Sequence, residues 1–204
     1  MSSATRHIAG FQATEIRRGW GRVWRSAIAA TFAVGTVGCS TVNPEPLRAV
    51  DRPIDLDRFM GDWYVLAHIP IEIPFFSEAN AYNGIESYRL TDKGIIETTY
   101  RFRDGSFDGP EVVFNPRAWV HNDETGAEWR MQFVWPFRAA YVIAYVDDDY
   151  HNTIIGVPNR RNAWIMSRSP QASDAELAML TSKLLDLGYD TAKLRTVPQQ
   201  WPGM

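Results

Sequence analysis

Between residues 62 and 168, the sequence repeats short runs in which apolar and polar side chains alternate, and this constrains the fold most strongly. Successive side chains of a β-strand point to opposite faces, so each run predicts a strand with one buried face. Clusters of turn-forming residues, such as Thr91–Gly94 and Asn159–Asn162, separate the runs. The sequence predicts eight strands, at residues 62–69, 80–90, 94–103, 111–120, 127–135, 140–147, 151–157 and 162–168.

Eight successive strands with short connections favour an all-β fold, either an up-and-down antiparallel barrel or a sandwich. One helix is also predicted, because Ser173–Glu176 forms a capping box and leucines follow it at helical spacing as far as Gly188. Residues 194–197 predict a last short strand. The longest early connection, residues 70–79, holds Phe75 and Phe76 and is expected to form an apolar lid.

The first 38 residues have the pattern of a secretory signal. Five arginines precede an uncharged, largely apolar run at residues 26–38. A membrane-spanning helix needs roughly 20 apolar residues, and this run is shorter. We therefore predict a signal peptide at 1–38, a tether at 39–53 and one folded domain at 54–200. A cytosolic protein with an ordinary cysteine in a disordered tail is the alternative.

Cys39, the only cysteine, directly follows the apolar run, so intrachain disulfides and multi-cysteine metal sites are excluded. The surrounding residues 37–40 resemble the lipobox of bacterial lipoproteins, although Thr36 stands where leucine is usual. The resemblance implies cleavage after Gly38, acyl chains such as palmitate on Cys39, and attachment to the outer membrane, facing the periplasm. Ser40 is the residue type associated with that sorting.

The charge balance argues against nucleic-acid binding. Residues 1–38 hold five of the 21 basic and one of the 24 acidic side chains, so the remainder carries 16 basic and 23 acidic ones. Zinc-protease, phosphate-loop and nucleophile-elbow motifs are absent from the sequence. His68 is out of phase with Trp63 and is predicted to point outward. Asp147–Asp149 predicts a solvated turn, because the glycine and glutamate of a calcium loop are missing. No cofactor, metal or catalytic residue is predicted.

Strand parity identifies candidates for the interior. An eight-stranded barrel is just wide enough to be filled by side chains or to hold one small ligand, and parity alone leaves both open. In several strands one parity is richer in aromatic and apolar residues and is predicted to face inward. The candidates for lining a cavity are Tyr100, Phe114, Met131, Phe133, Trp135, Tyr141 and Tyr145.

Three short motifs occur in order along residues 50–200: Gly61-x-Trp63-Tyr64, Asp147-x-x-Tyr150, and the segment 165–170 around Arg168. They resemble the motifs of the lipocalin family, in particular bacterial outer-membrane lipocalins related to apolipoprotein D. The resemblance implies an eight-stranded up-and-down barrel with one C-terminal helix packed outside. It also implies that the motif residues Gly61, Trp63, Asp147, Tyr150 and Arg168 serve the fold, with the arginine lying over the tryptophan at the closed barrel end.

The same resemblance implies a carrier with an apolar cavity, open at one end, for fatty acids, lysophospholipids or similar amphiphiles. Two other functions stay open. One is a lipocalin-type enzyme that acts on an apolar substrate through cavity tyrosines. The other is an envelope protein-interaction module with a filled barrel. A homodimer is also possible.

Overall fold

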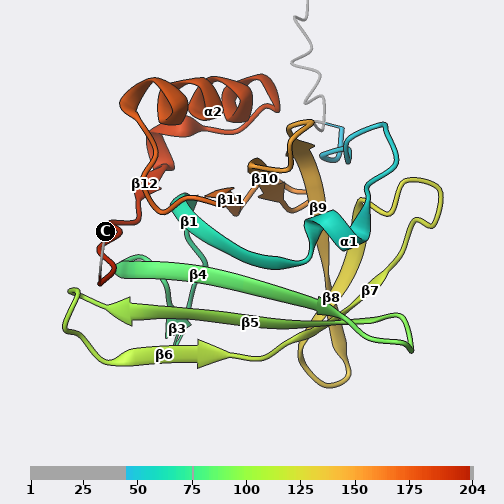
Figure 1. The fold of residues 1–204 in the computed structure, drawn as a ribbon, viewed down its shortest axis with the longest axis horizontal. Helices are drawn as coiled ribbons and strands as arrows, with labels where there is room; N and C mark the ends of the chain where they lie inside the picture. Colours follow the sequence, from blue (N-terminus) through green and yellow to red (C-terminus); the bar gives the residue numbers. More distant parts are fainter. Residues whose placement is uncertain (1–44, 75, 203–204) are drawn as a thin grey trace, which may run out of the picture. The chain divides into compact units, whose positions relative to one another are not determined.

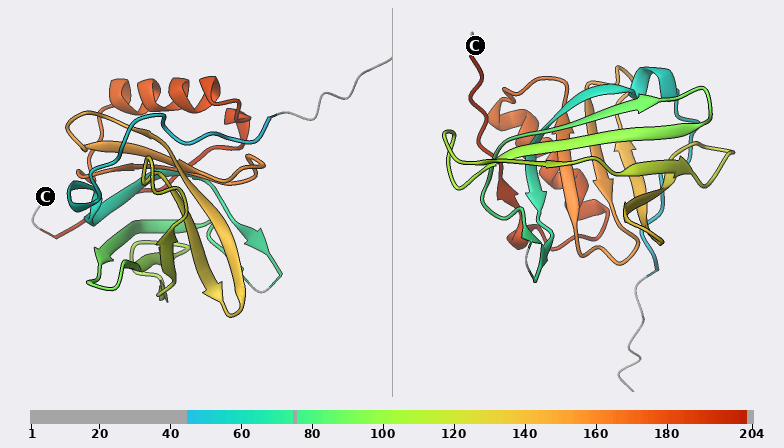
Figure 2. Two further views of the ribbon diagram at one scale, coloured as in Figure 1. Left: turned by 90° about the vertical axis from the view of Figure 1, so that its right-hand side faces the viewer. Right: turned by 90° about the horizontal axis from the view of Figure 1, so that it is seen from below.

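The computed structural model describes residues 45–74 and 76–202, in which the main sheet closes into one antiparallel barrel (Figures 1 and 2). Each strand of the barrel pairs with the next barrel strand along the chain, and the last pairs with the first. The predicted eight-stranded up-and-down barrel is therefore confirmed. Its strands are β1 (Gly61–Ile69), β4 (Ala81–Leu90), β5 (Ile95–Asp104), β6 (Glu111–Phe114) continued by β7 (Arg117–Val120), β8 (Glu128–Val134), β9 (Phe137–Val146), β10 (Asn152–Gly156) and β11 (Ala163–Ser167).

The fourth barrel strand is broken between β6 and β7. Pro116 lies in the break, where a residue without an amide hydrogen cannot donate to a strand ladder. Strand β7 pairs with β5 on one side and β8 on the other. Strand β6 pairs with β5 alone, so the ladder is interrupted between β6 and β8.

Shorter strands and helices lie in the connections outside the eight barrel strands. The connection after β1 contains a ribbon of β2 (Glu72–Ile73) and β3 (Phe76–Ser77), while Phe75 of the predicted lid lies outside the described residues. The predicted last strand is β12 (Arg195–Thr196), which pairs with β1 and follows the 3₁₀ helix η1 (Thr191–Lys193). A one-turn helix, α1 (Leu56–Phe59), precedes β1. In the described part of the chain, helices are too short or too polar to cross a membrane.

Helix α2 (Asp174–Asp186) packs on the outside of the barrel, as predicted. Its N-cap is Ser173, whose hydroxyl accepts a hydrogen bond from the Glu176 amide at 3.2 Å. Gly188 ends it with a φ of +85°, a left-handed conformation that glycine adopts without steric cost. Leu180 and Leu184 are fully buried against the sheet.

Two apolar clusters divide the interior. The inner core fills the barrel and contains Trp63 and Trp129. The outer core lies between the sheet and α2 and contains Ile154, Ile165, Leu180 and Leu184. Consecutive residues of a strand contribute alternately to these two cores, so an extra residue in a strand transfers every later side chain to the other core.

The strand pairings show such extra residues in β1, β4, β8 and β9, and those in β1 and β9 reverse a predicted orientation. In β1 the register shifts between Val65 and Ala67, after which His68 pairs with the inner-core residue Trp164. The prediction that His68 points outward is therefore wrong. In β9 the residues opposite Ile154 and Ile155 are Tyr145 and Ile143, which leaves one residue unpaired between them.

Candidate functional site

One end of the barrel is filled by four aromatic rings, here called the aromatic plug: Phe59, Trp63, Tyr88 and Trp129. Trp63 is fully buried, and its indole nitrogen donates to the Phe59 carbonyl at 2.9 Å. The Phe59 ring centroid lies 5.1 Å from that of Trp63 and 5.5 Å from that of Trp129. These distances are typical of favourable aromatic packing, so this end of the barrel is solid.

Arg168 closes the aromatic plug from outside. Its guanidinium carbon lies 3.8 Å from the Trp63 ring centroid, within the range of a cation–π interaction. The same guanidinium donates to the backbone carbonyls of residues 58, 59, 60 and 62 at 2.6 to 3.1 Å. Burial lowers the pKa of Arg168 to about 10, so the group stays charged at neutral pH. Gly61 has a φ of +92°, and a Cβ there would lie 3.4 Å from the guanidinium.

The second motif holds the turn between β9 and β10. The Asp147 carboxylate accepts from the backbone amides of His151 at 2.7 Å and Asn152 at 2.9 Å. The Tyr150 hydroxyl accepts from the Asp55 amide at 2.7 Å. The Asp147 carboxylate therefore orders the backbone of this turn, and no group of three potential metal ligands gathers among the described residues.

Beyond the aromatic plug lies a cavity of about 460 Å³, within the usual range for small-molecule sites. Ten apolar residues form most of its wall: Ile71, Ile73, Phe76, Phe114, Met131, Phe133, Val134, Ala139, Ala140 and Val157. Val134 is 68% exposed and marks the mouth. Tyr141 stacks on Trp129 of the plug at 5.5 Å and marks the opposite, inner end. Lysine and arginine are absent from the lining within the described chain.

Five of the seven residues predicted to line a cavity do so, namely Tyr100, Phe114, Met131, Phe133 and Tyr141. Trp135 does not line it, because β8 ends at Val134 and the indole stands 81% exposed in the turn to β9. Tyr145 also lies elsewhere, because the extra residue in β9 turns its ring outward. There the Lys183 ammonium approaches the ring centroid at 4.4 Å.

Two buried carboxyl groups at the inner end were not predicted from the sequence. Glu78 is 1% and Glu86 is 6% exposed, and both line the cavity. Burial raises the pKa of each to about 7. We call Glu78, Glu86, Tyr100, Tyr141 and Trp164 the cavity floor. Glu86 lies on the same face of β4 as Tyr88 and pairs with Trp63 of β1. The alternation of side chains along β4 therefore indicated that Glu86 points into the barrel.

Hydrogen bonds hold the floor carboxyls in place. Glu78 accepts from the Ile71 amide at 2.7 Å and from the Trp164 indole at 3.4 Å. Glu86 accepts from the Tyr141 hydroxyl at 3.3 Å. The His68 ring nitrogen Nδ1 is 3.9 Å from Glu78, but burial lowers the pKa of His68 to about 4. The imidazole is therefore neutral at pH 7 and does not compensate the carboxylate charge.

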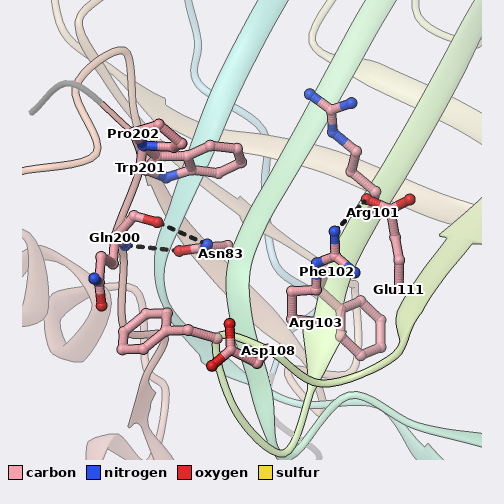
Figure 3. Close-up of a pocket in the computed structure, with 10 residues that line it drawn as sticks. Asn83, Arg101, Phe102, Arg103, Asp108, Glu111, Gln200, Trp201 and Pro202 are labelled. Atoms are coloured by element: carbon pink, nitrogen blue, oxygen red, sulfur yellow. Dashed lines mark hydrogen bonds and ion pairs between the residues drawn. The ribbon is translucent and has the colours of Figure 1, made fainter.

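A second pocket of about 440 Å³ lies on the outer surface (Figure 3). It forms where the C-terminal segment lies along β4, with Asn83 and Gln200 exchanging hydrogen bonds at 2.8 and 2.7 Å. Charges of both signs line it, including Arg101 and Asp108. It shares no lining residue with the barrel cavity, and its walls are much more polar. The barrel cavity is therefore the better candidate site.

Comparison with solved structures shows that this barrel is a known fold. Apocrustacyanin C2 is 16% identical with a TM-score of 0.57, over 77% of this chain and 90% of that one. Insecticyanin from the tobacco hornworm Manduca sexta is 16% identical with a TM-score of 0.56, over 78% of this chain and 85% of that one.

Curated sequences and a family model add evidence on the family. Temperature-induced lipocalin-1 of Arabidopsis thaliana is 29% identical over 161 residues, covering 74% of this chain and 82% of that protein. Outer membrane lipoprotein Blc of Escherichia coli K12 is 27% identical over 174 residues, covering 84% and 94%. A model of the lipocalin-like domain matches residues 54–199. The chain therefore belongs to the lipocalin family.

Proposed function

We propose that this lipocalin is a carrier for amphiphiles with an acyl chain, such as fatty acids and lysophospholipids, and serves lipid storage, transport or envelope maintenance. The observation that supports the proposal is a cavity of about 460 Å³ with a largely apolar wall and an exposed mouth. Burying an acyl chain there removes apolar surface from water, which contributes about 25 cal/mol per Å².

The charges of the cavity orient an anionic ligand. Glu78 and Glu86 lie at the inner end, and no described lysine or arginine lines the cavity. Above pH 7, where both carboxyls are mostly ionised, a carboxylate or phosphate at that end would meet like charge without compensation, at an electrostatic cost that is large in a low-dielectric interior. An anionic amphiphile is therefore expected to bind with its chain inward and its headgroup at the mouth.

A negative charge placed in the cavity wall is expected to weaken acyl-chain binding at least about tenfold. Phe114→Asp tests this, because Phe114 lines the cavity and packs edge-on against Phe76 at 4.7 Å. Val113→Asp is the matched control on the same strand, since Val113 is 46% exposed and absent from the cavity lining. Titration with dodecanoate, followed by tryptophan fluorescence, measures both affinities. Equal losses in the two variants would contradict binding in this cavity.

Extraction of the protein, purified without detergent, distinguishes the carrier from the two alternatives. Mass spectrometry is expected to find acyl lipid in near-stoichiometric amount and chemically unchanged. A chemically altered lipid would favour the enzyme. A protein that neither carries nor binds any amphiphile would favour the envelope interaction module.

Anchoring of the chain in the outer membrane through acylated Cys39 is part of the proposal. Cys39 lies outside the described residues, and the support is its sequence context together with the relatives named outer membrane lipoproteins. When the full chain is produced in a Gram-negative host with an alkyne-tagged palmitate, label is expected in the outer-membrane fraction. Cys39→Ser is expected to abolish the label. Unlabelled wild-type protein would contradict anchoring but leave the carrier proposal standing.

A further inference from the structure

The cavity floor has an excess of hydrogen-bond acceptors and negative charge. Two carboxyl groups, from Glu78 and Glu86, line one cavity. In the described chain, the sole potentially cationic group within 4.0 Å of either is His68, which is neutral at pH 7. A buried carboxylate without a cationic partner is costly, so a ligand that supplies a positive charge gains from replacing that missing partner.

A further polar group of the floor is poorly satisfied. The Tyr100 side chain is 8% exposed and lines the cavity, and its hydroxyl faces Glu78 without a hydrogen bond of regular geometry in the described part of the chain. Both floor carboxyls act on it, since their charges add to burial in raising the pKa of Tyr100. Buried polar groups are normally satisfied, so this hydroxyl points to a ligand with a polar end at this depth.

We propose that the cavity floor binds the ammonium group of a long-chain amine, with its hydrocarbon chain extending toward the mouth. The inference rests on the proposed carrier function and specifies a ligand class with the opposite orientation to an anionic amphiphile. An ammonium group has three donors and one positive charge. Glu86 is its main partner, because the 3.3 Å hydrogen bond from Tyr141 and the interaction with Tyr88 leave carboxylate lone pairs free.

Groups from five strands determine how this site titrates. Glu86 on β4 is faced by Tyr88 of its own strand, Tyr100 of β5, Tyr141 of β9 and the preceding Glu78. The groups that face Glu78 are His68 of β1, Tyr100 of β5 and Trp164 of β11. Two arginines act on neighbours of the floor carboxyls, Arg195 on His68 and Arg168 on Tyr88.

The proposal predicts a pH dependence with a definite sign. The floor carboxyls have pKa values of about 7, so they are mostly ionised at pH 8 and mostly protonated at pH 6. An alkylammonium, like lysine, keeps its charge until about pH 10. Amine affinity is therefore expected to fall about tenfold between pH 8 and pH 6, because the amine pairs with the ionised carboxylate.

Three ligands with the same chain test the proposal: dodecylamine, dodecanol and dodecanoate. At pH 8 we expect dodecylamine to bind at least about tenfold more tightly than dodecanol, with dodecanoate weakest. In Glu86→Gln, the ratio of amine to alcohol affinity is expected to fall at least about tenfold. The exposed Glu124→Gln serves as the matched control and is expected to keep the wild-type ratio.

The outcomes separate this inference from the proposed function. Equal amine and alcohol affinities, or dodecanoate binding most tightly, would overturn the ammonium site while leaving a carrier of apolar chains. An amine preference that persists in both Glu86→Gln and Glu78→Gln would also overturn it. If none of the three ligands binds in competition with the others, the carrier proposal itself fails.

Discussion

Trp63→Ala is expected to lower the free energy of unfolding by about 3–5 kcal/mol, the range for truncating a large aromatic side chain in a core. The indole is fully buried in the aromatic plug, where it packs on Phe59. Its removal leaves a cavity and takes away the surface over which the Arg168 guanidinium lies. The five hydrogen bonds that Arg168 donates to backbone carbonyls do not refill that space.

Trp135→Ala is the matched control, since it is the same substitution at an indole that is 81% exposed. It is expected to change stability by less than about 0.5 kcal/mol, as exposed positions usually do. Urea unfolding followed by far-ultraviolet circular dichroism measures both variants independently of tryptophan fluorescence. Comparable losses at the two positions would show that the aromatic plug is not the stabilising end of the barrel.

The order and number of the strands could be predicted because alternation and turn residues are local properties of the sequence. Helix α2 was equally predictable, since Ser173 and Gly188 mark its two ends and both have the expected cap conformations. Breaks within a barrel strand are harder to predict, because few residue types in the sequence mark them. The break at Pro116 fell inside one predicted strand, which the structure divides into β6 and β7.

Parity failed where a strand gains an extra residue. The residue inserted between Val65 and Ala67 turned His68 inward, and the one beside Tyr145 turned that ring outward. Neither position has a glycine or proline that would mark a bulge in the sequence. Bulges are selected by how the sheet must curve to close, which is a property of the whole barrel rather than of a short run.

The floor carboxyls were missed for a different reason. Charged residues are rarely buried, so an acidic residue within a strand is normally assigned to the solvent face. Glu86 follows Ile85, and both are buried because β4 contributes to the barrel interior and to its outer packing. A local preference that the fold overrides at one position is a common property of functional sites.

Glu86→Gln is expected to stabilise the protein by up to about 3 kcal/mol at pH 8 and by less than about 1 kcal/mol at pH 5. Burial raises the pKa of Glu86 to about 7, whereas an unperturbed glutamate has a value of 4.5. Between these pH values the folded state holds more protons than the unfolded state, so wild-type stability falls as pH rises through this window. The uncharged glutamine avoids that loss.

Comparing the two proteins by urea unfolding at pH 5 and pH 8 isolates this effect from the other titrating groups. His68 has the opposite dependence, because a pKa lowered to about 4 costs stability as pH falls below 6.5, but it is present in both proteins. The exposed Glu124→Gln is expected to show no such difference between the two pH values. A gain that is the same at pH 5 and pH 8 would mean that Glu86 is already neutral or already paired. A pH-dependent gain would show that the chain keeps a destabilising charge in its cavity, as expected of a group that serves ligand binding at the expense of stability.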